Sequence, residues 1–174
     1  LFGDSLKAVY DKSAESMERS QVALARSEGG NAGDDAGKGL KNGFVYGESG
    51  PVQITEAGHR FEVDFVRGQK TGFFLDQRGN RLFAQFYGAK RKVLNACCYS
   101  GAFSVYALKG GASHVDSLDS SKQALAWTDV NVELNRPFSG THRTILADVK
   151  QFLAEEGDMY DMTILDPPAP IRPH

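Results

Sequence analysis

The second half of the chain alternates between short apolar runs and longer amphipathic stretches. Four runs have the length and composition of buried strands, and they lie at residues 93–97, 114–118, 143–146 and 162–165. The stretches between them have the spacing of helices, which are predicted at residues 103–108, 120–135 and 149–153. Because strands that alternate with helices form parallel sheets, the pattern predicts an α/β fold with a doubly wound parallel sheet.

Residues 51–65 show a different pattern, in which apolar and polar side chains alternate. Phe61, Val63 and Phe65 share one face of an extended segment, and Ala57-Gly58 separates this segment from a second one before it. Alternation of this kind is typical of a strand with one buried face. The pattern therefore predicts a half-buried β-hairpin.

The remaining parts of the first half give weaker signals. Residues 4–26 consist mostly of helix formers and predict a short strand and a helix, whereas residues 27–43 contain six glycines and predict a mobile loop. A further helix is predicted through residues 81–88. We therefore expect three parts, which are an N-terminal helical segment with a Gly-rich loop (1–42), a small β-hairpin unit with a connecting helix (43–91) and the parallel sheet (92–174).

The composition is that of an ordinary soluble globular protein, with 41% hydrophobic and 24% charged residues among 174. No apolar run approaches the roughly 18 residues that a membrane-spanning helix needs, so we expect no membrane partner. The adjacent Cys97 and Cys98 cannot form a disulfide framework, which favours a reducing, cytoplasmic location. Because the chain begins at Leu1 rather than Met, we expect that it is trimmed.

Positive charge is concentrated between Arg67 and Lys92. This segment holds seven Lys or Arg residues and a single acid, Asp76, in a chain whose net charge is −2. A local basic surface of this kind can meet the phosphate backbone of a nucleic acid. Ordinary charged residues on a solvated helix face would give the same pattern. The sequence leaves both interpretations open.

Three aspartates, Asp119, Asp148 and Asp166, follow the ends of consecutive predicted strands. Open α/β sheets bind ligands in the crevice beyond the carboxyl ends of their strands, where these side chains would converge. Pro167-Pro168 cannot continue a strand, so the chain must leave the sheet there and present Asp166 at the strand tip. Asp119 and Asp148 could instead favour the start of the helix that follows each of them. The coincidence of all three favours a ligand cleft.

The loop after the first strand of the sheet, residues 95–101, contains a single glycine, Gly101. It does not match the Gly-x-Gly-x-x-Gly pattern that brings backbone amides close to a pyrophosphate. This mismatch disfavours NAD and FAD and favours a nucleotide-like cofactor without phosphate. The two thiols lack Cys-x-x-Cys spacing and a neighbouring histidine, so no metal site is predicted.

Three segments resemble motifs of the bacterial 23S ribosomal RNA cytosine-5 methyltransferase family. They are Gly-Gln-Lys-Thr-Gly-Phe-Phe-Leu-Asp-Gln-Arg at 68–78, Val-Leu-Asn followed by Tyr-Ser-Gly-Ala-Phe-Ser within 93–104, and Leu-Asp-Pro-Pro-Ala at 165–169. The first is specific to the family and the last is shared more widely. The resemblance runs from about Gly43 to the end of the chain. It implies a class I, Rossmann-like methyltransferase fold that binds S-adenosyl-L-methionine, with ribosomal RNA as the partner.

The resemblance also implies roles for individual residues. Tyr99, Ser100 and Gly101 would surround the methionine part of the cofactor, with Asp119 on the ribose and Asp148 near the adenine. The reaction would be the displacement of a methyl group from a sulfonium, which requires donor and acceptor to be held in line. The candidate catalytic residue is Asp166. Four residues would help to close the cleft, namely Lys70, Thr71, Phe73 and Arg78. Together with these four, the cofactor-binding set comprises Asn95, Tyr99, Ser100, Gly101, Asp119, Ser120, Asp148, Asp166 and Pro167.

Ala169 bears on the identity of the acceptor. Methyltransferases that act on exocyclic amines have an aromatic residue after their Asp/Asn-Pro-Pro motif, so Ala169 argues against adenine N6 chemistry. Cytosine C5 is a poor nucleophile, and enzymes that methylate it attack C6 with a cysteine thiolate. Cys97 and Cys98 end a strand where small side chains pack, so we expect them to be structural. In the family, the nucleophile lies on a later segment.

The resemblance implies a longer protein, with an RNA-binding domain ahead of Leu1 and further strands after Asp166. We therefore expect residues 92–174 to be the cofactor-binding half of a partial Rossmann-like domain, and the chain to be inactive as a methyltransferase. The last strand would be an open edge, which invites a homodimer. Two alternatives stay open. They are a guanine methyltransferase of the same fold and a non-catalytic RNA-binding module.

Overall fold

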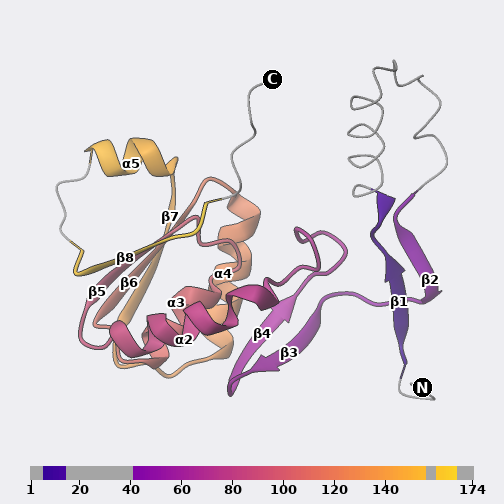
Figure 1. Cartoon of the computed structure of the whole chain (residues 1–174), viewed down its shortest axis with the longest axis horizontal. Helices are drawn as coiled ribbons and strands as arrows, with labels where there is room; N and C mark the ends of the chain where they lie inside the picture. The colour runs from indigo at the N-terminus through magenta and orange to yellow at the C-terminus, as the bar shows by residue number, and fades with distance from the viewer. Residues whose placement is uncertain (1–5, 15–40, 156–159, 168–174) are drawn as a thin grey trace. The chain divides into compact units, whose positions relative to one another are not determined.

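The computed structural model describes residues 6–14, 41–155 and 160–167 (Figure 1). The chain forms two compact units, residues 1–52 with 64–72 and residues 53–63 with 73–174. The helix predicted within residues 4–26 and most of the Gly-rich loop predicted at 27–43 lie outside the described residues. The predicted three-part division at residues 42 and 91 stays a prediction from the sequence.

The first unit contains a two-stranded antiparallel sheet. Its strands are β1 (Ala8–Asp11) and β2 (Gly43–Gly47). The rings of Tyr10, Phe44 and Phe65 pack edge to face, with centroids 5.0 to 6.4 Å apart. Lys12 Nζ donates to the backbone carbonyl of Phe65 at 3.0 Å, which ties residues 64–72 to the sheet. The short strand predicted near the N-terminus is confirmed as β1.

A hairpin of strands β3 (Val52–Glu56) and β4 (His59–Val63) forms where the alternating pattern predicted it. Ala57 and Gly58 join the strands with φ angles of 48° and 82°, the positive values that a type I′ turn requires. Phe61 is buried in the core of the second unit, as predicted. Phe65 lies beyond the end of β4, because the Asp64 carboxylate accepts hydrogen bonds from the next backbone N–H groups and starts a turn.

The second unit is built on a four-stranded parallel sheet, which confirms the predicted fold class (Figure 1). Its strands are β5 (Lys92–Ala96), β6 (His114–Asp119), β7 (Thr141–Leu146) and β8 (Met162–Leu165). The spatial order is β7-β6-β5-β8. The chain thus builds outward from β5 to β7 and then crosses to the other side of β5. The carboxyl ends of β5 and β8 flank this switch point, where open sheets bind ligands.

Helices cover both faces of the sheet. They are α2 (Arg78–Tyr87), which follows the 3-10 turn η2 (Leu75–Gln77), α3 (Ala102–Lys109), α4 (Lys122–Leu134) and α5 (Val149–Glu155). On one face, Val93 of β5 packs in a cluster with Val105 of α3. On the other, Leu94 packs with Phe152 of α5. Because successive strand residues point to opposite faces, burial of both faces explains why the predicted strands are continuous apolar runs.

The helix boundaries follow the sequence signals closely. Ser121 is the N-cap of α4, and its side chain accepts a hydrogen bond from the Ala124 N–H at 3.2 Å. Gly88 and Gly110 stand at the C-caps of α2 and α3. Leu153, a position used to predict α5, is largely exposed. Within the described ranges, no helix has both the length and the apolar character needed to cross a membrane.

Candidate functional site

The loops that leave the carboxyl ends of the strands gather around Cys97. Burial raises the pKa of this thiol, and the carboxylates of Asp119, Asp166 and Asp148 raise it further. The three aspartates therefore lie close enough to act on one side chain, although they follow three different strands. The structure thus brings together the carboxylates that the sequence placed at the strand ends. They make this edge of the sheet electronegative.

The loop at residues 97–101 has a strained backbone. Cys97 and Tyr99 have φ angles of 59° and 49°, which side-chain-bearing residues seldom adopt, and Gly101 has a φ of 74°. A Cβ atom at Gly101 would also lie 2.5 Å from Thr128 Cγ2, so only glycine fits at this position. Strained backbone of this kind persists where the surrounding structure enforces it, and it is concentrated at binding sites.

Asp119 enforces the shape of this loop. Its Oδ2 accepts a hydrogen bond from the Tyr99 N–H at 3.0 Å, and its Oδ1 accepts one from the Ser121 N–H at 2.9 Å. One side chain therefore joins the end of β6 to the loop after β5 and to the start of α4. Each carboxylate oxygen has a second lone pair, so the group can still accept hydrogen bonds from a diol. Ser120, between these residues, is exposed.

Asp148 caps the helix that follows it. Its Oδ1 accepts hydrogen bonds from the N–H groups of Lys150 and Gln151, at 2.9 and 3.1 Å. These are the contacts expected of an acid that stabilises the start of a helix. Asp119 makes one contact of the same kind, with the Ser121 N–H. Asp148 is also exposed at the ligand edge of the sheet, so the same carboxylate can meet a ligand.

An aromatic group stands beside the loop. The Tyr99 ring makes edge-to-face contacts with Phe74 and Trp127, with centroid distances of 5.3 and 5.7 Å. Thr128 Oγ1 donates to the Tyr99 carbonyl at 2.9 Å. Neither Phe74 nor Trp127 is among the predicted site residues. Each residue carries one signal in the sequence, since Phe74 lies in the family motif and Trp127 is the only tryptophan of the chain.

Asn95 begins a buried polar chain across the sheet. Its Nδ2 donates to Ser104 Oγ at 2.8 Å, Ser104 bonds to Ser117 Oγ at 2.6 Å, and Ser117 bonds to His142 Nε2 at 2.8 Å. Burial lowers the pKa of His142 to about 4. Asn95 Oδ1 is buried and has no hydrogen-bond partner among the described residues. A free buried acceptor two residues before Cys97 fits a cofactor that carries an ammonium group, such as the methionine part of S-adenosylmethionine.

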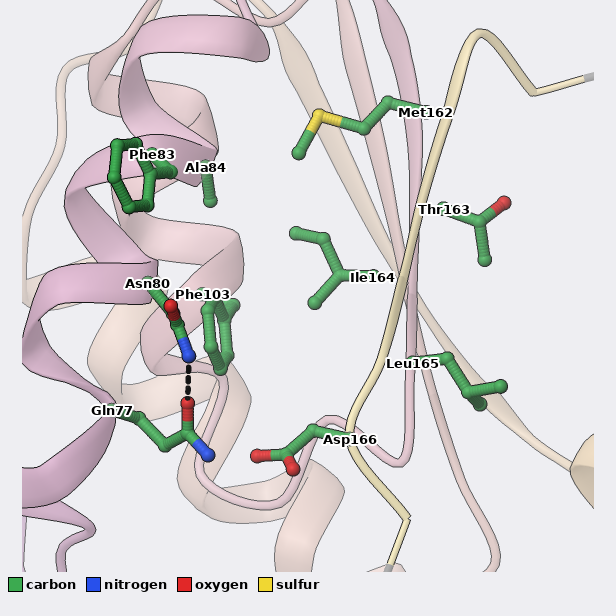
Figure 2. Close-up of a pocket in the computed structure, with 10 residues that line it drawn as sticks. All are labelled: Gln77, Asn80, Phe83, Ala84, Phe103, Met162, Thr163, Ile164, Leu165 and Asp166. Atoms are coloured by element: carbon green, nitrogen blue, oxygen red, sulfur yellow. Dashed lines mark hydrogen bonds between the residues drawn. The ribbon is translucent and has the colours of Figure 1, made fainter.

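A pocket of about 300 Å³ lies between α2 and β8 (Figure 2). Figure 2 shows the Asp166 carboxylate at one end, directed toward the Gln77 side chain, whose Oε1 accepts a hydrogen bond from Asn80 Nδ2 at 2.7 Å. Apolar side chains of both elements line the remainder, with Ile164 of β8 facing α2. Pro167 is exposed immediately after Asp166. The predicted catalytic residue therefore borders a pocket that is polar at one end.

The four residues predicted to close the cleft lie in different environments. Phe73 is buried against Phe61, with ring centroids 5.0 Å apart, and so belongs to the core. Arg78 is exposed at the first residue of α2. Lys70 and Thr71 are exposed in the first unit, where Lys70 has a φ of 49°. Their role in closure stays a prediction.

The basic residues between 67 and 92 are not all exposed. Arg81 is buried and paired with Glu56. Lys90 and Arg91 are exposed just before β5, at the opposite edge of the sheet from the loop at 97–101. The number of Lys and Arg residues in this segment therefore overstates its basic surface, because the sequence does not distinguish a buried guanidinium from an exposed one.

The chain's two cysteines are poor nucleophiles in this structure. Burial raises the pKa of Cys98 to about 12, and burial together with the neighbouring carboxylates raises that of Cys97. Since the thiolate is the reactive form, neither side chain is activated. Among the described residues, no group of three or more His, Cys, Asp or Glu side chains is arranged to hold a metal ion.

Comparison with known proteins relates this arrangement to a family. The family model of S-adenosylmethionine-dependent methyltransferases matches residues 43–172. A ribosomal RNA large subunit methyltransferase of Deinococcus radiodurans is 47% identical over 140 residues, covering 77% of this chain and 34% of the relative. The ribosomal RNA large subunit methyltransferase I of Aeromonas hydrophila is 40% identical over 174 residues, covering 97% and 42%. The chain thus spans between a third and about two fifths of the length of these curated relatives.

Solved structures share the same architecture. A protein of Streptococcus mutans described as an S-adenosylmethionine-dependent methyltransferase has a TM-score of 0.66 at 32% identity, covering 73% of this chain and 35% of its own. A second structure, of a methyltransferase complexed with S-adenosylhomocysteine, has a TM-score of 0.64 at 31% identity, with the same coverage. The strand order, the strained loop and the converging aspartates are therefore explained together, since this chain belongs to the S-adenosylmethionine-dependent methyltransferase family.

Proposed function

We propose that this chain provides the cofactor-binding sheet of a methyltransferase that modifies large-subunit ribosomal RNA. The observation that carries the proposal is the position of Asp119, Asp148 and Asp166 at or just after the carboxyl ends of β6, β7 and β8, at the switch point of a parallel sheet. The RNA substrate is supported by the relatives, which are named as ribosomal RNA large subunit methyltransferases. We further propose that the protein works in the cytoplasm, where this RNA is made.

The charges of the site suit a cationic donor. When bound, S-adenosylmethionine supplies an electrophilic methyl group on a sulfonium. We propose that Asp119 uses its free lone pairs to accept hydrogen bonds from the ribose hydroxyls, while Asp148 lies near the adenine. Tyr99 and Ser100 would surround the methionine part, whose ammonium would donate to Asn95 Oδ1. These residues would hold the donor in one orientation, which is the main contribution that a protein makes to a displacement of this kind.

We propose that the acceptor base enters beside Asp166. The carboxylate is exposed at the tip of β8 and borders the pocket shown in Figure 2. Pro167 restricts the backbone conformation of Asp166. In this position, Asp166 can accept a hydrogen bond from the base and orient the reacting atom toward the methyl group.

We propose that the methyl acceptor is cytosine C5 and that the nucleophilic thiolate comes from a residue other than Cys97 or Cys98. Neither Cys97 nor Cys98 is activated, and attack on cytosine C6 needs a thiolate. We therefore propose that the chain alone does not turn over on ribosomal RNA. Incubation with methyl-labelled cofactor and large-subunit RNA tests this. Label on cytosine C5 would contradict the proposed inactivity, and label on guanine would favour the alternative substrate.

Calorimetric titration with S-adenosylhomocysteine tests cofactor binding directly. We expect saturable binding of one molecule per chain, weakened by Asp119→Asn. The matched control is Asp129→Asn, an exposed acid on α4 that makes no hydrogen bond to the loop among the described residues, which should leave the affinity unchanged. A folded sample that gives no heat would contradict the proposal and favour a non-catalytic RNA-binding module.

We also propose that a second copy of the chain can pair along β8. In the described part of the chain, β8 is hydrogen-bonded to β5 on one side and to no strand on the other. Leu165 is 55% exposed at the end of this strand, and Phe86 of the neighbouring helix α2 is 75% exposed. An edge that is apolar and carries no charge or proline within the strand invites pairing.

A further inference from the structure

The side chain of Arg81 is almost completely buried, at 2% exposure, and each of its three guanidinium nitrogens donates a hydrogen bond. Nε and Nη2 donate to the two carboxylate oxygens of Glu56, at 2.8 and 2.9 Å. Nη1 donates to the backbone carbonyl of Phe74 at 2.9 Å. The guanidinium carbon also lies 4.7 Å from the centroid of the Phe73 ring. Arg81 therefore joins helix α2, the β3–β4 hairpin and the segment before η2.

A buried ion pair of this kind needs an explanation other than stability. Removing two charges from water costs about as much as their attraction returns, so hydrophobic residues of similar volume often serve as well. The Glu56 carboxylate is satisfied further by the Tyr106 hydroxyl, which donates to Oε1 at 2.9 Å. The planar guanidinium holds its donors in fixed directions, so when Nε and Nη2 bind Glu56, Nη1 is directed at the Phe74 carbonyl.

Phe74 connects this fork to the loop at residues 97–101. Its carbonyl accepts from Arg81 and from the Gln77 N–H at 3.2 Å, and its ring meets the Tyr99 ring edge to face at 5.3 Å. Tyr99 is one of the two non-glycine residues of the loop with a positive φ. We propose that Arg81 is a positioning residue, which holds Tyr99 in place through Phe74 and thereby preorganises the loop for the cofactor.

This inference rests on the proposed function only for what the loop binds. The contacts of Phe74 with Arg81 and Tyr99 exist without a ligand, so they can be tested without one. Trp127 provides the reporter, because it is the only tryptophan of the chain and its ring lies 5.7 Å from that of Tyr99. A change in the position of Tyr99 alters the surroundings of this indole.

A double-mutant cycle tests the proposal, with Arg81→Lys, Phe74→Leu and the two combined. Lysine keeps the charge and can pair with Glu56, but it lacks the fork that reaches the Phe74 carbonyl. We expect each single variant to raise the dissociation constant for S-adenosylhomocysteine about tenfold. If Arg81 acts through Phe74, the dissociation constant of the double variant should be no higher than the higher of the two single-variant values. All three should shift the Trp127 emission of the ligand-free protein.

Arg143→Lys is the matched control. Arg143 makes the same two-pronged pair with Asp116, at 2.8 and 3.0 Å, and within the described residues its side chain makes no hydrogen bond to the loop at 97–101. It should change neither the Trp127 emission nor the affinity for S-adenosylhomocysteine. Additive effects of Arg81→Lys and Phe74→Leu on the dissociation constant, or unchanged emission in both, would overturn the proposal.

Two further outcomes are also decisive. If Arg81→Lys does not fold, Phe74→Leu alone must still weaken binding and shift the emission, because it leaves the Arg81–Glu56 pair intact. If the unmodified chain binds no S-adenosylhomocysteine, the proposed function fails, whereas the emission spectra still decide whether Arg81 positions Tyr99 through Phe74.

Discussion

The carboxylate of Asp119 accepts a hydrogen bond from the backbone N–H of Tyr99 at 3.0 Å. This bond crosses from the end of β6 to the loop after β5, and it holds a residue whose φ of 49° is unfavourable on its own. The same carboxylate accepts from the Ser121 N–H at 2.9 Å. Asp119 therefore shapes the loop before any ligand arrives, and its contribution to folding is coupled to its contribution to binding.

The substitution Asp119→Asn should weaken both the stability of the fold and the binding of the cofactor. The amide keeps the size of the side chain but has one acceptor oxygen in place of two, so one of the two backbone N–H groups loses its partner. We expect the free energy of unfolding to fall by about 2 kcal/mol. Urea denaturation measures this, and calorimetry with S-adenosylhomocysteine should show a weaker affinity in the same variant. Unchanged stability would mean that the loop does not depend on these bonds.

Gly101→Ala should destabilise the chain strongly. The new Cβ atom would lie 2.5 Å from Thr128 Cγ2, in a backbone conformation with a φ of 74°. We expect a loss of about 3 kcal/mol, from overpacking together with backbone strain. Gly111→Ala is the control, because Gly111 has a φ of 89° but no atom within 4 Å of the added Cβ. It should lose only about 1 kcal/mol, the cost of the left-handed backbone. Equal losses in thermal or urea unfolding would show that Thr128 can move aside.

His142 should make stability depend on pH. Burial lowers its pKa to about 4 from an ordinary value of 6.5, so the folded state binds fewer protons than the unfolded state between these values. The stabilisation is complete above pH 6.5 and is lost as the pH falls toward 4. This group should account for roughly 3 kcal/mol of that loss. Urea denaturation across this range should show a shallower fall for His142→Gln. Parallel curves would contradict the assignment.

The edge of β8 should govern self-association. Light scattering after gel filtration should detect a dimer that Leu165→Lys weakens, because lysine on an edge strand opposes pairing. Leu146→Lys is the matched control, since Leu146 is 49% exposed at the end of β7, the opposite edge of the sheet. A monomer at all concentrations, or equal effects of the two substitutions, would exclude pairing along β8.

Local signals in the sequence were sufficient for the framework of the fold. The apolar runs predicted all four strands of the parallel sheet, and Ala57-Gly58 predicted the hairpin turn. Asp119, Asp148 and Asp166 could be located because the end of a strand is a local property, and parallel strands share one carboxyl edge. Periodicity alone therefore located the carboxylates and the edge at which they meet.

Contacts between distant residues could be decided only by the tertiary structure. Arg81 and Glu56 are 25 residues apart, and the sequence shows Arg81 only as one of the seven basic residues between Arg67 and Lys92. Phe73 and Phe74 are adjacent and chemically identical, yet Phe73 enters the core while Phe74 meets Tyr99. The reason is that periodicity records whether a side chain is buried, whereas its partner depends on how separate elements pack. Which residues hold the loop at 97–101 is therefore a property of the packed fold.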